Sequence, residues 1–284
     1  MGPDGRDGGR PPETRDMTRD LLLTLLVVAA LVPVSLLGLR QHPARDAMFW
    51  SAMTMALASP TLWSVIQIGD TWRTGFSIAL WVTVSISLWL FAGLAAWYRE
   101  AWRLAPLLAP YMLILAGFAA ALSQTPLGGL TDRVPAAWVA VHIGVSVVTY
   151  GLVTVAAIAA LAAFLQDRAL KAKRPTALTR ALPSMADCER LLVRLLAVGE
   201  SVLAIGLASG MAVQFEETGQ LLMFDHKTLL TIAAFVVIGA LLLAHYTSGL
   251  RGRQATRFVL LAYLLLTLGY PGVKFVTEVL LARI

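Results

Sequence analysis

The sequence predicts an all-α membrane protein, a polytopic bundle of about eight transmembrane helices. Its composition carries this prediction, because 58% of the residues are hydrophobic and only 14% are charged, against about 25% charged in a typical soluble domain. In addition, apolar runs recur along the whole chain, each with the roughly 20 residues needed to cross about 30 Å of hydrocarbon. The lipid bilayer is therefore the expected partner of most of the chain.

The elements follow in order from an N-terminal tail, residues 1–19, which is rich in Gly, Pro and charged residues. Such a composition cannot bury an apolar core, so the tail is expected to be disordered, and Met17 inside it is an alternative start of the chain. The remaining residues, 20–284, form one transmembrane bundle. Its helices are expected at 20–39, 48–68, 75–97, 104–122, 136–166, 191–213, 227–248 and 256–282.

Basic residues in the loops predict the orientation, because Lys and Arg gather on the cytoplasmic side of membrane proteins. The loop 167–194 holds seven of them and the segment 251–257 holds three arginines. With the other loops of that side the total is fourteen, against three on the opposite side. Both termini are thus expected outside. The net charge of +6 belongs to these loops, so it indicates topology and not a nucleic-acid partner.

The sequence contains no motif of a catalytic class. A phosphate-binding loop, a dinucleotide fingerprint, zinc-ligand spacing and a nucleophile–base arrangement are all absent, so no enzymatic activity is expected. The single cysteine, Cys188, excludes an intrachain disulfide and a C-x-x-C redox pair.

The histidines are the first candidates for a functional site, because ionisable side chains inside a membrane are costly. His142 lies about 9 Å below the outer end of its helix, and His245 lies about 27 Å below the outer end of its own, at 1.5 Å per residue. A depth difference of about 18 Å is too great for one metal or one haem iron. His142 is nearer to His226, and His245 is nearer to His42, which is expected to be solvated. A neutral imidazole bonded between helices is the alternative.

A polar stripe follows His142 along its helix. Ser146 and Thr149 stand four and seven residues after it, so the three side chains share one face, with Tyr150 at its border. This arrangement is typical of a pocket wall. Small hydroxyls also serve close packing and hydrogen bonds to helix carbonyls, which is the structural alternative.

One carboxylate and one glycine pair inside the predicted helices are further candidates for function or packing. Glu200 enters its helix from the cytoplasmic side and is expected within reach of His245, either as a structural contact or as a proton-linked pair. Gly206 and Gly210 form a small-xxx-small pair, which predicts a close helix–helix contact.

Four segments together resemble a known family: WVAVHIGVSVVTYG (138–151), FDHKTLLT (224–231), HYTSGLRGRQA (245–255) and LGYPGVKF (268–275). Their order and spacing are similar to those of the cytochrome c assembly proteins, the CcsA, CcmC and HemX group, and most of all to the YpjD-like branch. The resemblance covers about residues 136–282, and it implies a multi-pass protein of the inner membrane that handles haem b.

The resemblance also implies roles for single residues. His142 matches an outer haem ligand, and His245 matches a ligand of a second haem inside the membrane. Asp225 and Lys227 match the acid and the lysine of the family's W-D-P-K-E segment, in which His226 takes the proline position and is a candidate substitute ligand. The outer loop 210–227 departs from the pattern, since it has no tryptophan, and no histidine follows the last helix. Two further candidates for pairing with haem propionates are Arg251 and Arg253.

The expected function is therefore binding or positioning of haem b without chemistry of its own, with other membrane or haem-pathway proteins as partners. One alternative is a HemX-like regulator or scaffold that acts through the cytoplasmic loop 167–194 without haem. The other is a proton-linked small-solute transporter that uses Glu200 with His245.

Overall fold

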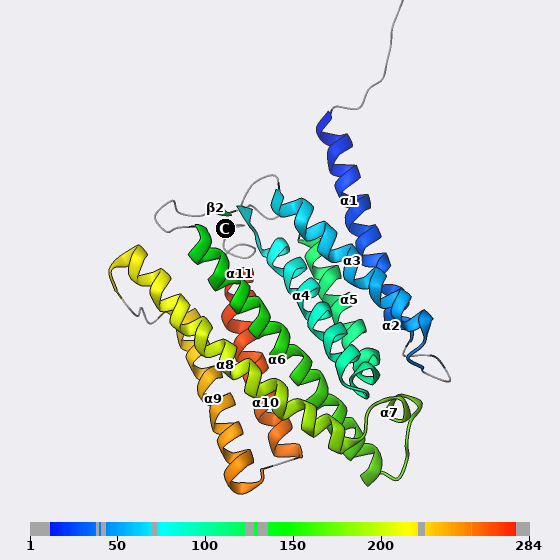
Figure 1. Ribbon diagram of the computed structural model, residues 1–284. Coiled ribbons are helices and arrows are strands. Elements are labelled where there is room, and N and C mark those ends of the chain that lie inside the picture. Colours follow the sequence, from blue (N-terminus) through cyan, green and yellow to red (C-terminus); the bar gives the residue numbers. More distant parts are fainter. Residues whose placement is uncertain are drawn as a thin grey trace, which may run out of the picture.

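The computed structural model describes residues 12–37, 40, 44–69, 73–122, 128–129, 136–220, 225–250 and 252–276. It confirms the all-α bundle. The long helices lie side by side, and successive ones run in opposite directions (Figure 1). The beginning of the first helix and the end of the last described one thus lie toward the same end of the bundle. Which side of the membrane that end faces stays a prediction.

Each predicted helix has a counterpart among the observed elements. The helices are α1 (Pro12–Ala30), α2 (Val32–Leu36), α3 (Ala47–Gly69), α4 (Phe76–Trp97), η2 (Ala101–Leu104), α5 (Ala105–Ala121), α6 (Ala136–Lys171), α7 (Ala177–Ala181), α8 (Met185–Thr218), α9 (His226–Ser248), α10 (Arg253–Thr267), η3 (Leu268–Gly272) and α11 (Val273–Phe275). Two short strands, β1 (Arg73–Thr74) and β2 (Gly128–Gly129), pair in an antiparallel ladder.

Seven helical segments of the described chain are long and apolar enough to span a membrane. The segment expected at 48–68 is helical as α3 but is not one of the seven, because its Ser, Thr, Trp, Pro and Gln residues lower its hydropathy. With 23 residues it is as long as α9, about 34 Å, and it packs beside α4 (Figure 1). The seven are Arg19–Leu36, Phe76–Trp97, Ala101–Ala121, Ala137–Lys171, Met185–Glu216, His226–Ser248 and Arg253–Gly272.

The first predicted boundary is corrected by the structure. Residues 12–19, expected in the tail, already belong to α1, and residues 1–11 lie outside the described residues. The single helix expected at 20–39 is divided at Leu31, just before Pro33 in the first turn of α2. Pro33 has no N–H to donate to the carbonyl of Ala29, four residues earlier, so the helical hydrogen-bond ladder is interrupted there.

The connection between α6 and α8 is much shorter than the predicted loop 167–194. Helix α6 continues to Lys171, α7 occupies the middle, and α8 already begins at Met185. Thr176 caps α7 and Ser184 caps α8, each accepting a hydrogen bond from an N–H three residues ahead. The basic residues of 167–194 predicted a loop, but these two caps start helices within that segment.

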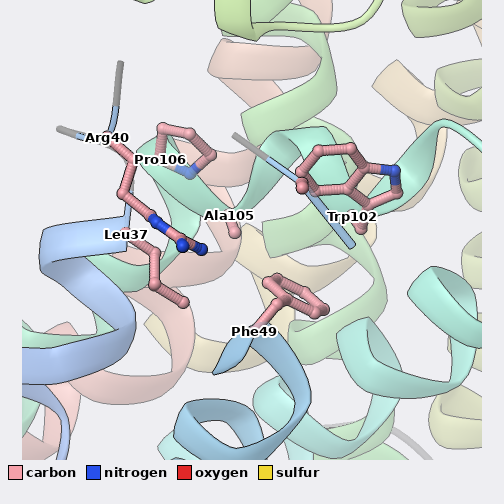
Figure 2. Close-up of a pocket in the computed structure, with 7 residues that line it drawn as sticks. Leu37, Arg40, Phe49, Trp102, Ala105 and Pro106 are labelled. Carbon is pink, nitrogen blue, oxygen red and sulfur yellow. The ribbon is translucent and has the colours of Figure 1, made fainter. Parts of the chain in front are cut away.

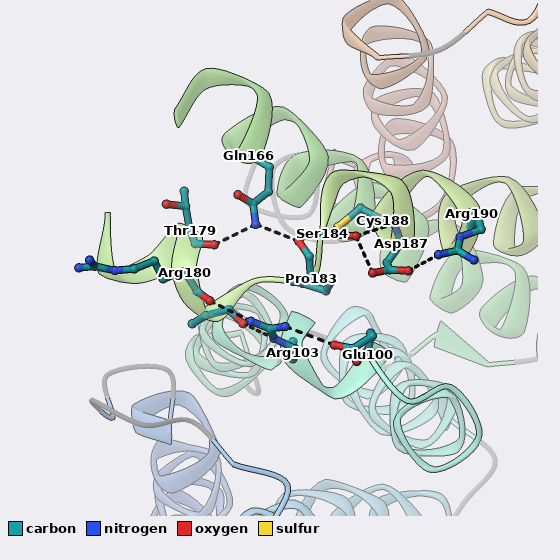
Figure 3. Close-up of polar contacts among 11 residues, drawn as sticks. Glu100, Arg103, Gln166, Thr179, Arg180, Pro183, Ser184, Asp187, Cys188 and Arg190 are labelled. Carbon is teal, nitrogen blue, oxygen red and sulfur yellow. Dashed lines mark hydrogen bonds and ion pairs between the residues drawn. The ribbon is translucent and has the colours of Figure 1, made fainter. Parts of the chain in front are cut away.

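This connection is fixed to the rest of the bundle by side-chain hydrogen bonds to its carbonyls. Arg103, at the turn between α4 and α5, donates from Nη2 to the carbonyl of Arg180 and from Nε to that of Ala181, both at 2.9 Å. Gln166 of α6 donates to two further carbonyls of the connection (Figure 3). The α6–α8 connection is therefore an ordered part of its end of the bundle.

A cluster of tyrosines joins the two halves of the chain in the bundle interior. The hydroxyls of Tyr111 on α5 and Tyr263 on α10 are hydrogen-bonded. Tyr150 on α6 bonds to Tyr263 at 3.1 Å and to Thr267 at 3.2 Å. Directly after this cluster α10 widens into the π-turn η3, which contains Pro271. Since proline lacks an N–H, the regular ladder cannot continue there.

Candidate functional site

His142 is half-buried in the second turn of α6 and contacts α8. Its Nδ1 lies 3.0 Å from Oγ of Ser209. That hydroxyl donates its one proton to the carbonyl of Gly206, also at 3.0 Å, so it accepts from the histidine. The imidazole therefore carries its proton on Nδ1, and the lone pair of Nε2 is available to a ligand.

The position of the His142 ring depends on a glycine in α8. A Cβ added at Gly210 would lie 2.9 Å from Cε1 of His142, whereas one added at Gly206 would meet Val145 at an ordinary 3.4 Å. The predicted glycine pair thus does mark a close contact between α6 and α8. Of the two glycines, Gly210 is the one that makes room for the histidine.

The polar stripe after His142 is used within its own helix. The hydroxyl of Ser146 donates to the carbonyl of His142 at 2.8 Å, and that of Thr149 donates to the carbonyl of Val145 at 2.9 Å. Thr149 is buried. These bonds favour the packing alternative over the pocket wall that the spacing predicted.

The start of α9 lies at the same end of the bundle as His142. Asp225 is the N-cap, and its Oδ1 accepts from the N–H of Thr228 at 2.7 Å. Slight burial raises the pKa of Asp225, but its hydrogen bonds to Thr228 and the charge of Lys227 together lower it more, so this pKa lies below the ordinary range. His226 and Lys227 are exposed in the first turn, and Lys227 is close enough to interact electrostatically with His142.

His245 lies in the last turn of α9, at the opposite end of the bundle (Figure 1). Its Nδ1 is 3.1 Å from the carbonyl oxygen of Leu250, which can only accept, so Nδ1 again carries the proton. The chain turns back through Gly249, whose φ of 67° is left-handed and costs glycine little. The two histidines thus lie at two levels, as the helix positions predicted.

Glu200 of α8 is not brought to His245. Its Oε1 lies 3.1 Å from where a Cβ on Gly239 would stand, and that glycine is six residues before His245 on α9, about 9 Å along the axis. Its Oε2 is buried with no hydrogen-bond partner in the described part of the chain. The predicted pairing with His245 is therefore corrected to a close approach of the Glu200 carboxyl to the backbone of α9.

The basic turn after His245 is held by an acid that the sequence did not single out. The N–H of Gly252 donates to Oε1 of Glu189 in α8 at 3.1 Å, which fixes the start of α10. Arg253 is exposed in the first turn of α10. Arg251 and His42 lie outside the described residues.

A family model described as "Cytochrome C assembly protein" matches residues 71–281, most of the chain. The protein belongs to the cytochrome c assembly family. The match begins with the segment before α4, so it takes in α4 and α5, which the motif resemblance at 136–282 did not include. This family is associated with haem handling.

Individual relatives agree with this membership. The chain is 50% identical over 270 residues to the "Uncharacterized 28.8 kDa protein in nifR3-like 5'region" of Azospirillum brasilense, covering 93% of this chain and all of the relative. It is 26% identical to "Inner membrane protein YpjD" of Escherichia coli K12, covering 76% and 80% of the two chains. It is also 23% identical to "Protein HemX" of Brevibacillus brevis, covering 69% and 73%.

The relatives and the helices together establish the location of this cytochrome c assembly family member. Seven of its helical segments can span a bilayer, and its YpjD relatives are inner membrane proteins. It is accordingly a multi-pass protein of the inner membrane, whose helices contact lipid.

Two residues that matter at its candidate site escaped prediction. Ser209 lies in the stretch LASGMA, where it reads as one more small residue for helix packing, and only the fold brings it to His142. Glu189 lies at the basic connection, where it reads as a solvated acid. Its contact with Gly252 joins positions 63 apart in the chain, and no local pattern marks it.

Proposed function

We propose that this membrane protein binds b-type haem at two levels, with Nε2 of His142 as an axial ligand in the outer half and Nε2 of His245 in the inner half. The observation that supports this most is common to both histidines: each donates its Nδ1–H to an oxygen of its own chain. Histidines that bind a metal almost always hold their other ring nitrogen in this way, which sets the tautomer and raises ligand basicity.

Positive charge near both histidines supports this proposal. Lys227 and His226 stand near the outer ligand, and Arg253 follows the inner one, so positive charge is available for haem propionates. When bound, the haem iron supplies redox and ligand-binding chemistry. The chain's own part is to hold each imidazole ring in place and to exclude water by packing the helices around it. We propose that it positions haem in this way and has no enzymatic activity of its own.

The test is a visible absorption spectrum of the purified protein with added haem, oxidised and reduced, beside His142→Ala and His245→Ala. Ser201→Ala is the control, because Ser201 is exposed and its hydroxyl bonds only within its own helix. We expect a Soret band that each of the first two variants weakens and the control retains. If the wild-type protein takes up no haem, or if neither variant changes the band, the proposal is refuted.

A second proposal, the HemX-like regulator, has one structural feature in its favour. The α6–α8 connection is ordered and presents exposed basic residues such as Arg168 and Arg174 at the predicted inner face. A rigid basic surface suits docking of a soluble haem-pathway protein. Capture of such an enzyme by the wild-type protein, and not by a variant with Arg168→Gln and Arg174→Gln, in the absence of bound haem would support this function over haem binding.

A further inference from the structure

A basic cavity lies where α4 turns into α5, at the predicted inner face. Its volume is about 460 Å³, and three of its lining side chains are arginines against one carboxylate. The positive-inside rule explains why cations lie at the inner helix ends. It does not explain why three of them surround one concave space. The lining residues are Arg45, Arg99, Glu100, Trp102 and Arg103.

Two of these arginines are held in place by the fold. Arg103 uses Nε and Nη2 on the carbonyls of the α6–α8 connection and pairs through Nη1 with Glu100 at 3.3 Å. Arg45 donates to the carbonyl of Ala96 at 3.2 Å, and its guanidinium lies 5.2 Å from the ring centroid of Trp50. Arg99 is exposed and has no hydrogen-bond or ion-pair partner among the described residues. Since Glu100 already pairs with Arg103, the cavity keeps a surplus of positive charge.

A small slot of about 20 Å³ shares Trp102 with this cavity. Its lining is mostly apolar and includes one charged side chain, Arg40. Figure 2 shows Trp102 and Phe49 on one side of the slot, with Leu37 and Pro106 opposite. Phe49 stands edge-on to the Trp102 ring, with centroids 5.8 Å apart. A basic space and a mostly apolar surface therefore share Trp102 at the helix ends that are predicted to face inward.

We propose that this cavity binds a phosphate-bearing anionic lipid, with the headgroup phosphate between Arg45 and Arg99 and part of an acyl chain lying over the apolar surface around Trp102. Guanidinium groups bind phosphate oxygens through paired hydrogen bonds. Basic pockets between transmembrane helices at the cytoplasmic side suit anionic headgroups. The apolar surface around Trp102 can contact an acyl chain, which a free phosphate lacks. The site is separate from both candidate haem-ligating histidines.

The test is native mass spectrometry of the full-length protein in detergent, titrated with dioleoyl phosphatidylglycerol, with dioleoyl phosphatidylcholine and with inorganic phosphate. We expect phosphatidylglycerol to bind most tightly, and excess inorganic phosphate not to displace it. Combined Arg45→Gln and Arg99→Gln should weaken its binding roughly 25-fold, at about 5-fold for each arginine, the equivalent of about 1 kcal/mol for a basic residue near an anionic surface.

The matched control combines Arg168→Gln with Arg174→Gln, which removes the same charge from the same predicted face away from the cavity. Equal weakening in both double variants, or equal affinity for the two lipids, would overturn the proposal in favour of general surface electrostatics. Displacement by inorganic phosphate would overturn the lipid assignment in favour of a phosphate site. Arg99→Gln alone breaks no contact inside the described chain, so it separates lost binding from lost folding, and it should weaken lipid binding by itself.

Discussion

Substitution of Gly210 by alanine tests whether α8 holds the imidazole of His142. The added Cβ would come within 2.9 Å of Cε1 of that ring, closer than real contacts of a methyl group allow. Because the ring is bound to Ser209 on the same helix, it cannot move away and keep this hydrogen bond. The glycine one turn earlier, Gly206, offers a matched control, since its added methyl would make only an ordinary contact at 3.4 Å.

The magnitude follows from the difference between the two variants. Both gain about 1 kcal/mol of helix propensity when glycine becomes alanine, so this contribution cancels. In the variant at Gly210 the ring either swings out and loses its hydrogen bond, at about 0.5–1.5 kcal/mol, or stays and is overpacked, at about 1–3 kcal/mol. We therefore expect Gly210→Ala to be about 0.5–3 kcal/mol less stable than Gly206→Ala.

The assay has two parts: unfolding of each variant in mixed micelles with increasing denaturing detergent, and haem titration followed at the Soret band. We expect Gly206→Ala to keep wild-type haem affinity. For Gly210→Ala we expect a loss of about 10- to 100-fold at the outer site, the usual effect of disturbing a ligand's supporting contact. If both variants unfold alike and bind haem alike, then the His142 ring is not held against α8 and the assigned tautomer loses its basis.

Three further predictions follow from the same contacts. Ser209→Ala should lower haem affinity at the outer site about 10-fold, whereas Ser201→Ala, which removes a hydroxyl bonded only within its own helix, should not change it. Asp225→Ala should destabilise the start of α9 by about 1 kcal/mol at neutral pH. Because the folded pKa of this carboxyl is lowered, its stabilising effect is present above the unfolded pKa and is lost as the pH falls to the folded pKa. Thermal unfolding of both proteins across that pH range would detect the loss. Tyr263→Phe should cost about 1–2 kcal/mol by removing two interhelical hydrogen bonds, against no loss of unfolding stability for the exposed Tyr246→Phe.

Much of the fold could be predicted from the sequence because membrane helices are recognised by local properties. Apolar length alone located α4, α5 and α9 to within a few residues, and the spacing of Gly206 and Gly210 predicted their close contact. The helix starts at Thr176 and Ser184 were not predicted, because the polar residues that cap helices are also common in loops. The Lys and Arg residues of the same segment were used only to predict the orientation in the membrane.

The two levels of the candidate histidines were predicted, but the residues that hold them in place were not. His142 and His245 stand out in any apolar run, and helix rise alone separates them into two levels. The partner of His142 could not be predicted, since Ser209 reaches it only through the packing of α6 on α8. Glu200 was misplaced because α8 begins at Met185 and not at the expected residue 191. The carboxyl therefore lies beside Gly239, six residues before His245 on α9.

The two histidines reach the same protonation pattern by different routes, and this difference has consequences for function. His142 is oriented by a hydroxyl on another helix, so its geometry depends on the α6–α8 contact. His245 is oriented by the carbonyl of Leu250, five residues along its own chain, in a turn that Glu189 of α8 contacts at Gly252. A change confined to the α6–α8 contact at Gly210 should therefore impair the proposed outer site and leave the proposed inner one intact. A protein that transfers haem from one level could use this asymmetry, because one ligand can be released by helix movement while the other stays in place.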